Sequence, residues 1–246
     1  MKEIKQVAKG NNITQVAIKA ERLQITLNEE QVKEMIASYV TNSDVIVKIV
    51  KDVIESIPPE QRVMPEKRVF VPTIQYLSYS IDDDVIRNTF KTLLRSSMNE
   101  NSCQIVHPSF GVIISQLNSD EVKLLNSLSI SSHIGYPVID VRLKTSGSND
   151  LGVSIIKNFS DVADNVCQNP NDVGVYLENL ERLKLIEIVN NVYLTDDSHY
   201  EKLKNHPKVL DFMNRTKGVA SVEYFLDKKL FRLTDFGVRF MQCCCL

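Results

Sequence analysis

A row of three amphipathic helices, each opened by its own capping residue, constrains the fold of this chain more than any other feature. The row is predicted over residues 78–128. In its first helix, residues 82–98, one stripe of side chains recurs at helical spacing: Ile86, Phe90, Leu93, Leu94 and Ser97. The stripe predicts burial against a core, while Arg87, Lys91 and Arg95 are predicted to stay in solvent.

Three consecutive aspartates precede this helix. We interpret Asp82, Asp83 and Asp84 as its cap and first-turn carboxylates, because carboxylates are favoured at a helix N-terminus. Metal ligation is the alternative interpretation. It is disfavoured because no second cluster of acidic residues or histidines accompanies the three aspartates in the sequence.

The second and third helices of the row have equally clear starts. Pro108 suits the first position of the second helix, where its missing amide would have no partner, and Ser119 is predicted to cap the third helix. The two apolar faces are Phe110, Ile113, Ile114 and Leu117 in the second helix, and Val122, Leu125 and Leu128 in the third. His107 is the strongest catalytic candidate, but no acid or thiol is paired with it, which favours an ordinary residue beside a helix start.

These helices and their flanks carry a resemblance to a known family. The helix ending LLRSSMNE, followed by VHPSF and QLNSDEVKLL, is similar to the bacterial abortive-infection alpha (Abi-alpha) family. The segments IPPEQRVMPEKRVFVPTIQYL, YLENLERLKLI and LFRLTDFGVRFMQCC resemble it too, so the resemblance covers roughly residues 55–245. It implies a context of phage resistance and no particular reaction. No catalytic residue is carried over from it.

The composition is typical of a soluble globular protein, with 43% of the 246 residues hydrophobic and 24% charged. The formal net charge of −2 favours neither nucleic acid nor an anionic membrane surface. The first residues lack the pattern of a secretory signal, and the most apolar run, residues 45–57, is interrupted by charges and too short to span a bilayer. We therefore expect a cytoplasmic protein without a membrane partner.

Five cysteines lie at positions 103, 167, 243, 244 and 245, without the spacings that hold zinc. They are interpreted as free thiols in a reducing compartment, and no metal or other cofactor is predicted. The final residues, CCCL, formally resemble a prenylation box, but such a box normally carries aliphatic residues after its cysteine. Structural thiols at the end of a last helix are the preferred interpretation.

The N-terminal region is predicted to contain a β-hairpin and two helices. Residues 13–27 alternate and are rich in β-branched side chains, which indicates the hairpin. The first helix follows a capping-box start at Asn28, and the second covers residues 44–57. Pro58 and Pro59 then end the region.

The C-terminal region is predicted to resemble a winged helix, because helix, turn, helix and hairpin follow in that order. Its second helix begins at Pro170. The hairpin joins residues 185–189 to residues 192–195 across Asn190 and Asn191, which tolerate the positive φ values of a two-residue turn.

A second hairpin and a last helix are predicted to end the chain. The hairpin joins residues 219–226 to residues 230–234 across a turn at residues 227–229. Thr234 and Asp235 open the last helix. We accordingly predict an α+β protein, mainly α-helical, with three parts: residues 1–57, an Abi-alpha-like helical body over residues 58–150, and the winged-helix-like module over residues 151–246.

Winged helices commonly bind DNA with the second helix and the wing. In this alternative reading the contacts come from Asn171, Arg182, Lys184, Asn190 and Asn191. Phosphate contacts supply most of the affinity for DNA, and this set contains only two cations. A scaffold or protein-docking role is therefore preferred for the module. Lys184 also occupies a position where such helices often end in glycine.

The sequence contains no P-loop, dinucleotide-binding fingerprint, HExxH motif or nucleophile-elbow serine, and only eight glycines. Glu121 and Lys123 have the spacing of a nuclease Glu-x-Lys pair, but they fall in a predicted helix rather than a strand. We therefore predict no catalytic, metal or cofactor site. The predicted function is that of a non-enzymatic cytoplasmic protein of phage defence that acts through protein–protein binding, with a homo-oligomer as one form. The alternative is a winged-helix regulator that binds nucleic acid.

Overall fold

The computed structural model describes residues 43–130, 135–147, 152–215 and 222–245, together with positions 33 and 36. The internal contacts divide the chain into two compact units, Met1–Ser115 and Gln116–Leu246. The hairpin predicted over residues 13–27 lies outside the described residues, and so does most of the helix after Asn28. The domain limits predicted at residues 57 and 150 stay a prediction.

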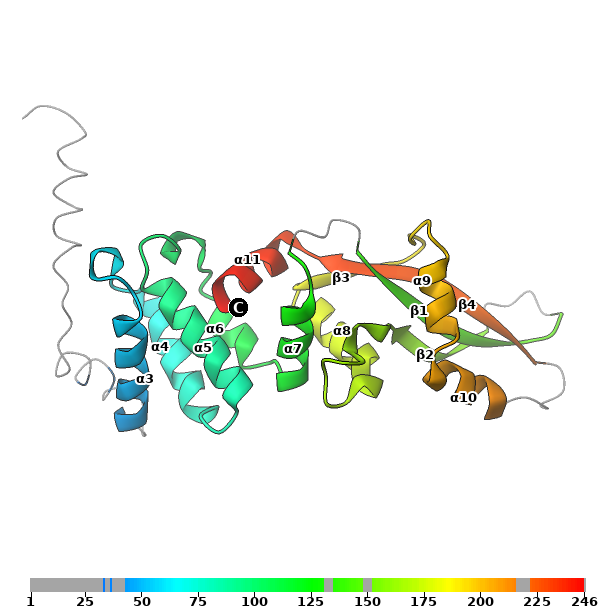
Figure 1. The fold of residues 1–246 in the computed structure, drawn as a ribbon, viewed down its shortest axis with the longest axis horizontal. Helices are drawn as coiled ribbons and strands as arrows, with labels where there is room; N and C mark the ends of the chain where they lie inside the picture. Colours follow the sequence, from blue (N-terminus) through cyan, green and yellow to red (C-terminus); the bar gives the residue numbers. More distant parts are fainter. Residues whose placement is uncertain are drawn as a thin grey trace, which may run out of the picture. The chain divides into compact units, whose positions relative to one another are not determined.

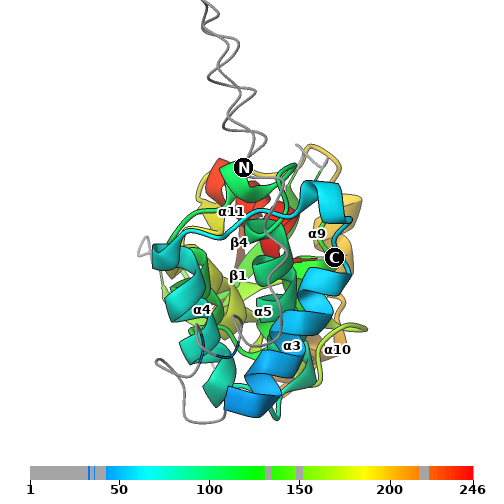
Figure 2. The same cartoon turned by 90° about the vertical axis from the view of Figure 1, so that its left-hand side faces the viewer.

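The described part of the first unit is built from helices (Figures 1 and 2). They are α3 (Ser43–Glu55), η1 (Pro59–Gln61), α4 (Lys67–Tyr79), α5 (Asp84–Ser97), η2 (Cys103–Ile105) and α6 (Phe110–Ile114). α4 and α5 contact each other and both contact α3 and α6, so these two helices form the centre of the described part of this unit. The core between these helices is apolar and includes Val50, Phe70, Ile74, Phe90 and Leu94.

The first helix of the predicted row forms as α5. Its predicted stripe is buried: Ile86, Phe90, Leu93, Leu94 and Ser97. The Asp83 carboxylate caps the helix, because it accepts hydrogen bonds from the backbone N–H groups of Val85 and Ile86 at 3.0 and 3.1 Å. The helix therefore begins at Asp84 rather than at Asp82. The capping interpretation of the aspartates is confirmed.

The other two helices of the row form with corrected starts. α6 begins at Phe110 rather than at Pro108. α7 (Ser119–Ser127) is capped by Asn118 instead of Ser119. The Asn118 side chain accepts from the Glu121 backbone N–H at 2.9 Å, and Glu121 accepts from the Asn118 N–H at 2.8 Å. This reciprocal capping box fixes the start one residue earlier than the serine suggested.

The second unit combines helices with a four-stranded antiparallel sheet (Figure 1). Its strands are β1 (Tyr136–Thr145), β2 (Val153–Phe159), β3 (Ile186–Val189) and β4 (Val222–Leu233), in the order β2-β1-β4-β3. Its helices after α7 are η3 (Asp161–Ala163), η4 (Pro170–Asp172), α8 (Val173–Arg182), α9 (Ser198–Lys204), α10 (Pro207–Arg215) and α11 (Asp235–Cys244). α8 contacts β2 and β3, while α9 contacts β1. The predicted mixture of helices and strands is therefore confirmed.

The predicted winged helix is wrong. The predicted hairpin between β3 and residues 192–195 does not form, because residues 192–195 are not in a strand. β3 pairs instead with β4, from Ile186 opposite Leu233 to Val189 opposite Leu230. The turn residues after β3 gave a local signal for a hairpin, but the backbone partner comes from a strand far along the chain.

The second predicted hairpin is also wrong. Residues 227–229 do not form a turn, because β4 runs through them and pairs with β1, with Asp227 opposite Asp140. Their polar character has another cause. Lys229 is only 5% exposed, and its ammonium group lies 2.7 Å from the Asp140 carboxylate. Asp227 pairs with Arg142, and Lys228 pairs with Asp197. Ion pairs therefore account for the three polar residues that the sequence suggested were a turn.

α8 ends in a Schellman motif built on a lysine. Lys184 has a φ of 61°, in the left-handed region that glycine usually occupies there. The Leu185 N–H donates to the Leu180 carbonyl at 3.0 Å, and the Lys184 N–H donates to the Glu181 carbonyl at 2.9 Å. Leu180 and Leu185 are both fully buried, as is common for this motif. The motif leads the chain directly from α8 into β3.

α11 begins against this same turn. Thr234 caps α11, as predicted, by accepting from the Gly237 N–H at 2.9 Å, and its hydroxyl donates to the Lys184 carbonyl at 2.6 Å. A Cβ atom at Gly237 would lie 1.8 Å from the Leu185 carbonyl oxygen. Only glycine therefore permits this approach of α11 to the end of α8.

The C-terminal cysteines lie in and directly after α11. Cys243 and Cys244 are buried and Cys245 is partly buried, which confirms their interpretation as structural thiols. Burial raises the pKa of Cys243 to about 11 and the pKa of Cys245 to about 12. Among the described helices, none combines the length and apolarity needed to cross a membrane.

Candidate functional site

The two cations of the nucleic-acid alternative lie at the end of α8. The Arg182 guanidinium donates hydrogen bonds to Gln116 Oε1 at 2.9 Å and to Asn179 Oδ1 at 2.7 Å. Lys184 is exposed and forms the left-handed turn already described. Arg182 is thus engaged in contacts within the second unit, where it joins α8 to the segment before α7.

The three asparagines of that alternative lie on other segments. Asn171 is exposed in η4, and its carbonyl accepts a hydrogen bond from the Lys208 ammonium group. Asn190 and Asn191 are exposed in the turn after β3, and Asn191 has the predicted positive φ, at 61°. Residues 192–195 form no wing, so the arrangement on which the nucleic-acid reading depended is not found among the described residues of the second unit.

A dense set of polar side chains centres on Asp120, in the first turn of α7. Asp120 is 6% exposed. Its carboxylate accepts from the Gln168 and Asn169 backbone N–H groups, both at 2.9 Å, and from the Tyr176 hydroxyl at 3.1 Å. Lys123 adds an ion pair at 3.2 Å. Burial opposes ionisation, but these hydrogen bonds outweigh it and lower the pKa of Asp120 to about 2.

Glu121 extends the same network to the middle of α8. Its Oε1 atom accepts from Asn179 Nδ2 at 2.8 Å, and Asn179 also donates to the Gln116 carbonyl at 3.0 Å. Burial raises the pKa of Glu121, against the effect of its hydrogen bonds from Asn118 and Asn179. Tyr176, Asn179 and Arg182 follow at three-residue spacing, so one face of α8 holds the first turn of α7.

The hydrogen bonds of this network connect α7 to α8 and to the segment around Gln168. Asp120 stays ionised near neutral pH, while burial first and the Asp120 hydrogen bond second raise the pKa of Tyr176. Burial also raises the pKa of Cys167 to about 11. A general acid or base works best with a pKa near the operating pH, which none of these three groups has. Within the described residues, no group of three or more His, Cys, Asp or Glu is arranged to hold a metal ion.

A second buried polar cluster lies within the sheet. The Lys229 ammonium group contacts Asp140 Oδ1 at 2.7 Å and Asn158 Oδ1 at 2.8 Å, and the Asn158 N–H donates to Asp140 at 2.8 Å. Asn158 has a φ of 50° at an irregularity of the β1–β2 register. The three side chains fix this bulge and join β1, β2 and β4.

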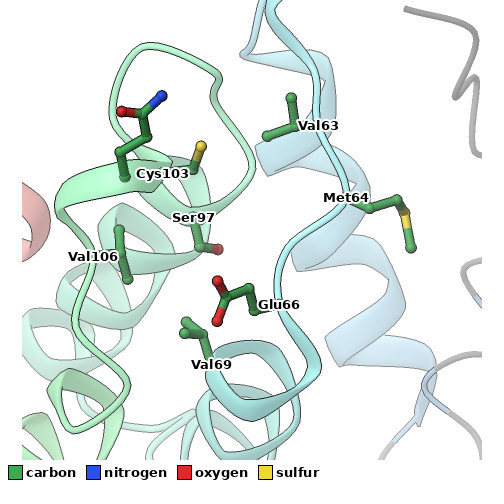
Figure 3. A pocket seen from close by; sticks show the side chains of 8 residues that line it. Val63, Met64, Glu66, Val69, Ser97, Cys103 and Val106 are labelled. Atoms are coloured by element: carbon green, nitrogen blue, oxygen red, sulfur yellow. The ribbon is translucent and has the colours of Figure 1, made fainter. Parts of the chain in front are cut away.

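A pocket of about 300 Å³ lies in the first unit (Figure 3). Its lining comes from the segment before α4, the first turn of α4, the end of α5 and the segment around η2: Val63, Met64, Glu66, Val69, Ser97, Cys103, Gln104 and Val106. In Figure 3 the Glu66 carboxylate points toward Ser97 and Val69. A shallower hollow of about 590 Å³ in the second unit is bordered by the Glu187–Arg232 ion pair.

His107 is exposed and does not line the pocket of the first unit. Its Nδ1 atom accepts from the Ser109 backbone N–H at 3.2 Å and lies 2.7 Å from the Ser109 hydroxyl. The imidazole thus interacts with the segment that leads into α6, which agrees with the preferred interpretation of a residue beside a helix start. Sequence reasoning missed both the Asp120 network and the pocket. The capping-box spacing from Asn118 to Glu121 was a local signal for the start of α7, but no local pattern indicated the partners of Asp120.

Comparison with known proteins supplies the family. A solved structure of an uncharacterized protein from the hydrocarbon-degrading marine bacterium Alcanivorax borkumensis SK2 is similar at 14% identity with a TM-score of 0.36, covering 58% of this chain and 94% of that one. This weak likeness carries no functional argument. No curated protein matches the chain. The family described as Abortive infection alpha matches residues 40–244, which confirms the resemblance, and the chain belongs to that family.

Proposed function

We propose that this protein acts in bacterial defence against phage by binding another protein rather than by catalysis. The observation that carries the proposal is membership of the Abortive infection alpha family over residues 40–244. We also propose a cytoplasmic location, on the basis of the sequence. The proposed protein partners include a second copy of this chain, which would form a homo-oligomer.

The use of the buried ionisable side chains supports binding over catalysis. Asp120, Glu121 and Lys229 each form hydrogen bonds or ion pairs that join separate elements of the second unit. A catalytic acid or base has to reach a substrate and exchange a proton with it. Groups with these partners are better suited to holding the fold that presents a binding surface.

Phage challenge of bacteria that express the chain tests the defence role. Cells with the gene are expected to yield fewer plaques than cells with an empty vector, across a panel of diverse phages. Protein recovered from challenged cells is expected to migrate as a larger complex than the purified chain. Equal plaque numbers with and without the gene across the panel would contradict the proposal.

Catalysis is tested separately through His107, the strongest catalytic candidate of the sequence. His107→Asn removes the imidazole, while the asparagine oxygen can still accept from the Ser109 N–H. His199→Asn, on α9 of the second unit, is the matched control. Both variants are expected to protect as well as the unaltered chain. Loss of protection by a folded His107→Asn protein alone would favour an enzyme.

A further inference from the structure

We propose that the pocket of the first unit binds a small organic amine, with a compact apolar body and one protonated amino group. The inference goes beyond the proposed function and does not depend on it. It rests on the size of the pocket, on the hydrogen-bonding character of its lining and on the fixed positions of its walls.

The size and the apolar part of the lining set the body of the ligand. A volume of about 300 Å³ lies at the small end of the range for ligand sites, roughly 300–1,000 Å³. Val63, Val69 and Val106 supply short branched walls, and Met64 supplies a flexible thioether. Such walls match a compact ring or short branched chain and leave no space for a nucleotide or an extended peptide.

The polar part of the lining accepts hydrogen bonds more than it donates them. Ser97 donates its hydroxyl hydrogen to the Leu94 carbonyl at 2.8 Å, which leaves its oxygen lone pairs for the pocket. The Cys103 thiol is directed to the Glu100 carbonyl at 3.8 Å. Within the lining, Gln104 alone has a side chain with N–H donors. A ligand rich in donors is therefore favoured over a ligand rich in acceptors.

Glu66 sets the charge of the ligand. Its side chain is more than half exposed, and its Oε2 atom lies 2.5 Å from the Arg68 Nε atom. In Figure 3 the carboxylate is directed toward Ser97 of the pocket lining. A protonated amine placed there gains a charge-assisted hydrogen bond. A carboxylate or phosphate in the same position would face the Glu66 carboxylate and be repelled. The acceptor-rich lining and the charge of Glu66 both favour a protonated amino group.

The walls are held in place by backbone hydrogen bonds. The Val63 N–H donates to the Met98 carbonyl at 2.9 Å, and the Glu100 N–H donates to the Gln61 carbonyl at 2.8 Å. Between these two bonds, Arg62 and Asn99 form an antiparallel bridge. The segment before α4 is thereby fixed to the segment after α5. A pre-formed pocket binds with less loss of conformational freedom than one that has to be ordered by its ligand.

Cyclohexylamine, cyclohexanol and cyclohexanecarboxylate, titrated into the full chain at constant pH, test the proposal. The three probes share one ring and differ in charge and hydrogen bonding. NMR shifts of the Val63, Val69 and Val106 methyl groups report binding directly. Protection of Cys103 from alkylation by iodoacetamide, followed by mass spectrometry, is the second measurement.

The amine is expected to shift the valine methyl signals at lower concentration than the alcohol, and the carboxylate is expected to leave them unchanged. Glu66→Gln preserves the shape of the side chain and removes its charge. It should weaken amine binding about threefold, the loss of one largely exposed ion pair, and leave alcohol binding unaltered. Glu60→Gln, an exposed residue of η1 outside the pocket, is the matched control and should bind like the unaltered chain.

Three results would overturn the proposal. One is the absence of methyl shifts with millimolar amine. Another is a carboxylate that binds as tightly as the amine. The third is equal amine affinity of Glu66→Gln and the unaltered chain. Protection of Cys103 by the amine, lost in Glu66→Gln and retained in Glu60→Gln, would support it.

Discussion

The two units bury different kinds of polar side chain. In the described part of the first unit these are hydroxyl groups: Thr73, Thr89, Ser96 and Ser97. In the described part of the second unit four of the five are ionisable: Asp120, Glu121, Asp140, Ser160 and Lys229. Burying a charge costs far more than burying a hydroxyl unless the charge is paired. The second unit therefore depends on partners in a way that the first unit does not.

The partners of these groups differ in sequence distance. The Thr89 hydroxyl donates to the Val85 carbonyl of its own helix at 2.9 Å. Asp120, in contrast, bonds the Asn169 N–H, and Lys229 bonds Asp140. Apolar packing between helices consequently defines the first unit. In the second unit, pairs of polar groups also specify which elements meet.

The largest loss of stability is expected for Lys229→Ala, because it leaves the Asp140 carboxylate buried without its cation. The free energy of unfolding should fall by about 3–5 kcal/mol, measured by urea denaturation. The neighbour Lys228 pairs with Asp197 at a more exposed site, so Lys228→Ala should cost much less than Lys229→Ala. Equal losses in the two variants would break the contrast between buried and exposed pairs.

Gly237→Ala comes next. Its new Cβ atom would overlap the Leu185 carbonyl, 1.8 Å away, and α11 would have to move. The expected loss is about 3 kcal/mol. In the first unit, a Cβ atom at Gly111 would lie 3.0 Å from the Thr73 hydroxyl oxygen, a side-chain atom that has to move by only a few tenths of an ångström. Gly111→Ala should therefore cost about 1 kcal/mol, and thermal unfolding of both variants compares the two sites.

Asp120→Asn is expected to cost about 2 kcal/mol at neutral pH, since the amide cannot accept all the hydrogen bonds of the carboxylate. The pKa of Asp120 is lowered to about 2 in the folded chain. Its ionised form therefore stabilises the fold above the unfolded-state pKa, about 3.9, and this contribution is lost as the pH falls toward 2. The difference between the two proteins should shrink over that interval in denaturation measured against pH. A constant difference would contradict the role given to the carboxylate.

The smallest effect is expected for Thr89→Val in the first unit. The substitution keeps the shape of the side chain and removes a hydrogen bond made within one helix. The change in unfolding free energy should stay within about 1 kcal/mol. A loss as large as that of Asp120→Asn would show that hydroxyl groups do more in the first unit than pack and bond locally.

The contrast between partners close in sequence and partners far apart in sequence also explains how much of the fold the sequence predicts. The buried stripe of α5, its aspartate cap and the threonine cap of α11 follow from residues within a few positions of each other. These predictions were correct. The pairing of Ile186 with Leu233 involves residues far apart in the chain, and a turn signal at Asn190 and Asn191 indicated a nearer partner. Both hairpin predictions in the second unit failed for this reason.

The candidate sites were less predictable than the fold. The pocket has walls from two segments, around Val63 and around Cys103, that meet only after α4 and α5 have packed. The Lys229–Asp140 pair requires the register of β1 and β4. In both cases, the residue types of one segment do not indicate which distant segment it will contact. The sequence did indicate the family, because that signal is carried by whole helices and their connections.

Protection from phage by Asp120→Asn tests the central claim most directly, namely that the buried ionisable groups of the second unit hold the fold rather than perform a reaction. The variant should be compared with the unaltered chain at a temperature where circular dichroism shows both to be folded. We predict equal reduction in plaque number. A folded Asp120→Asn protein that no longer protects cells would contradict the account.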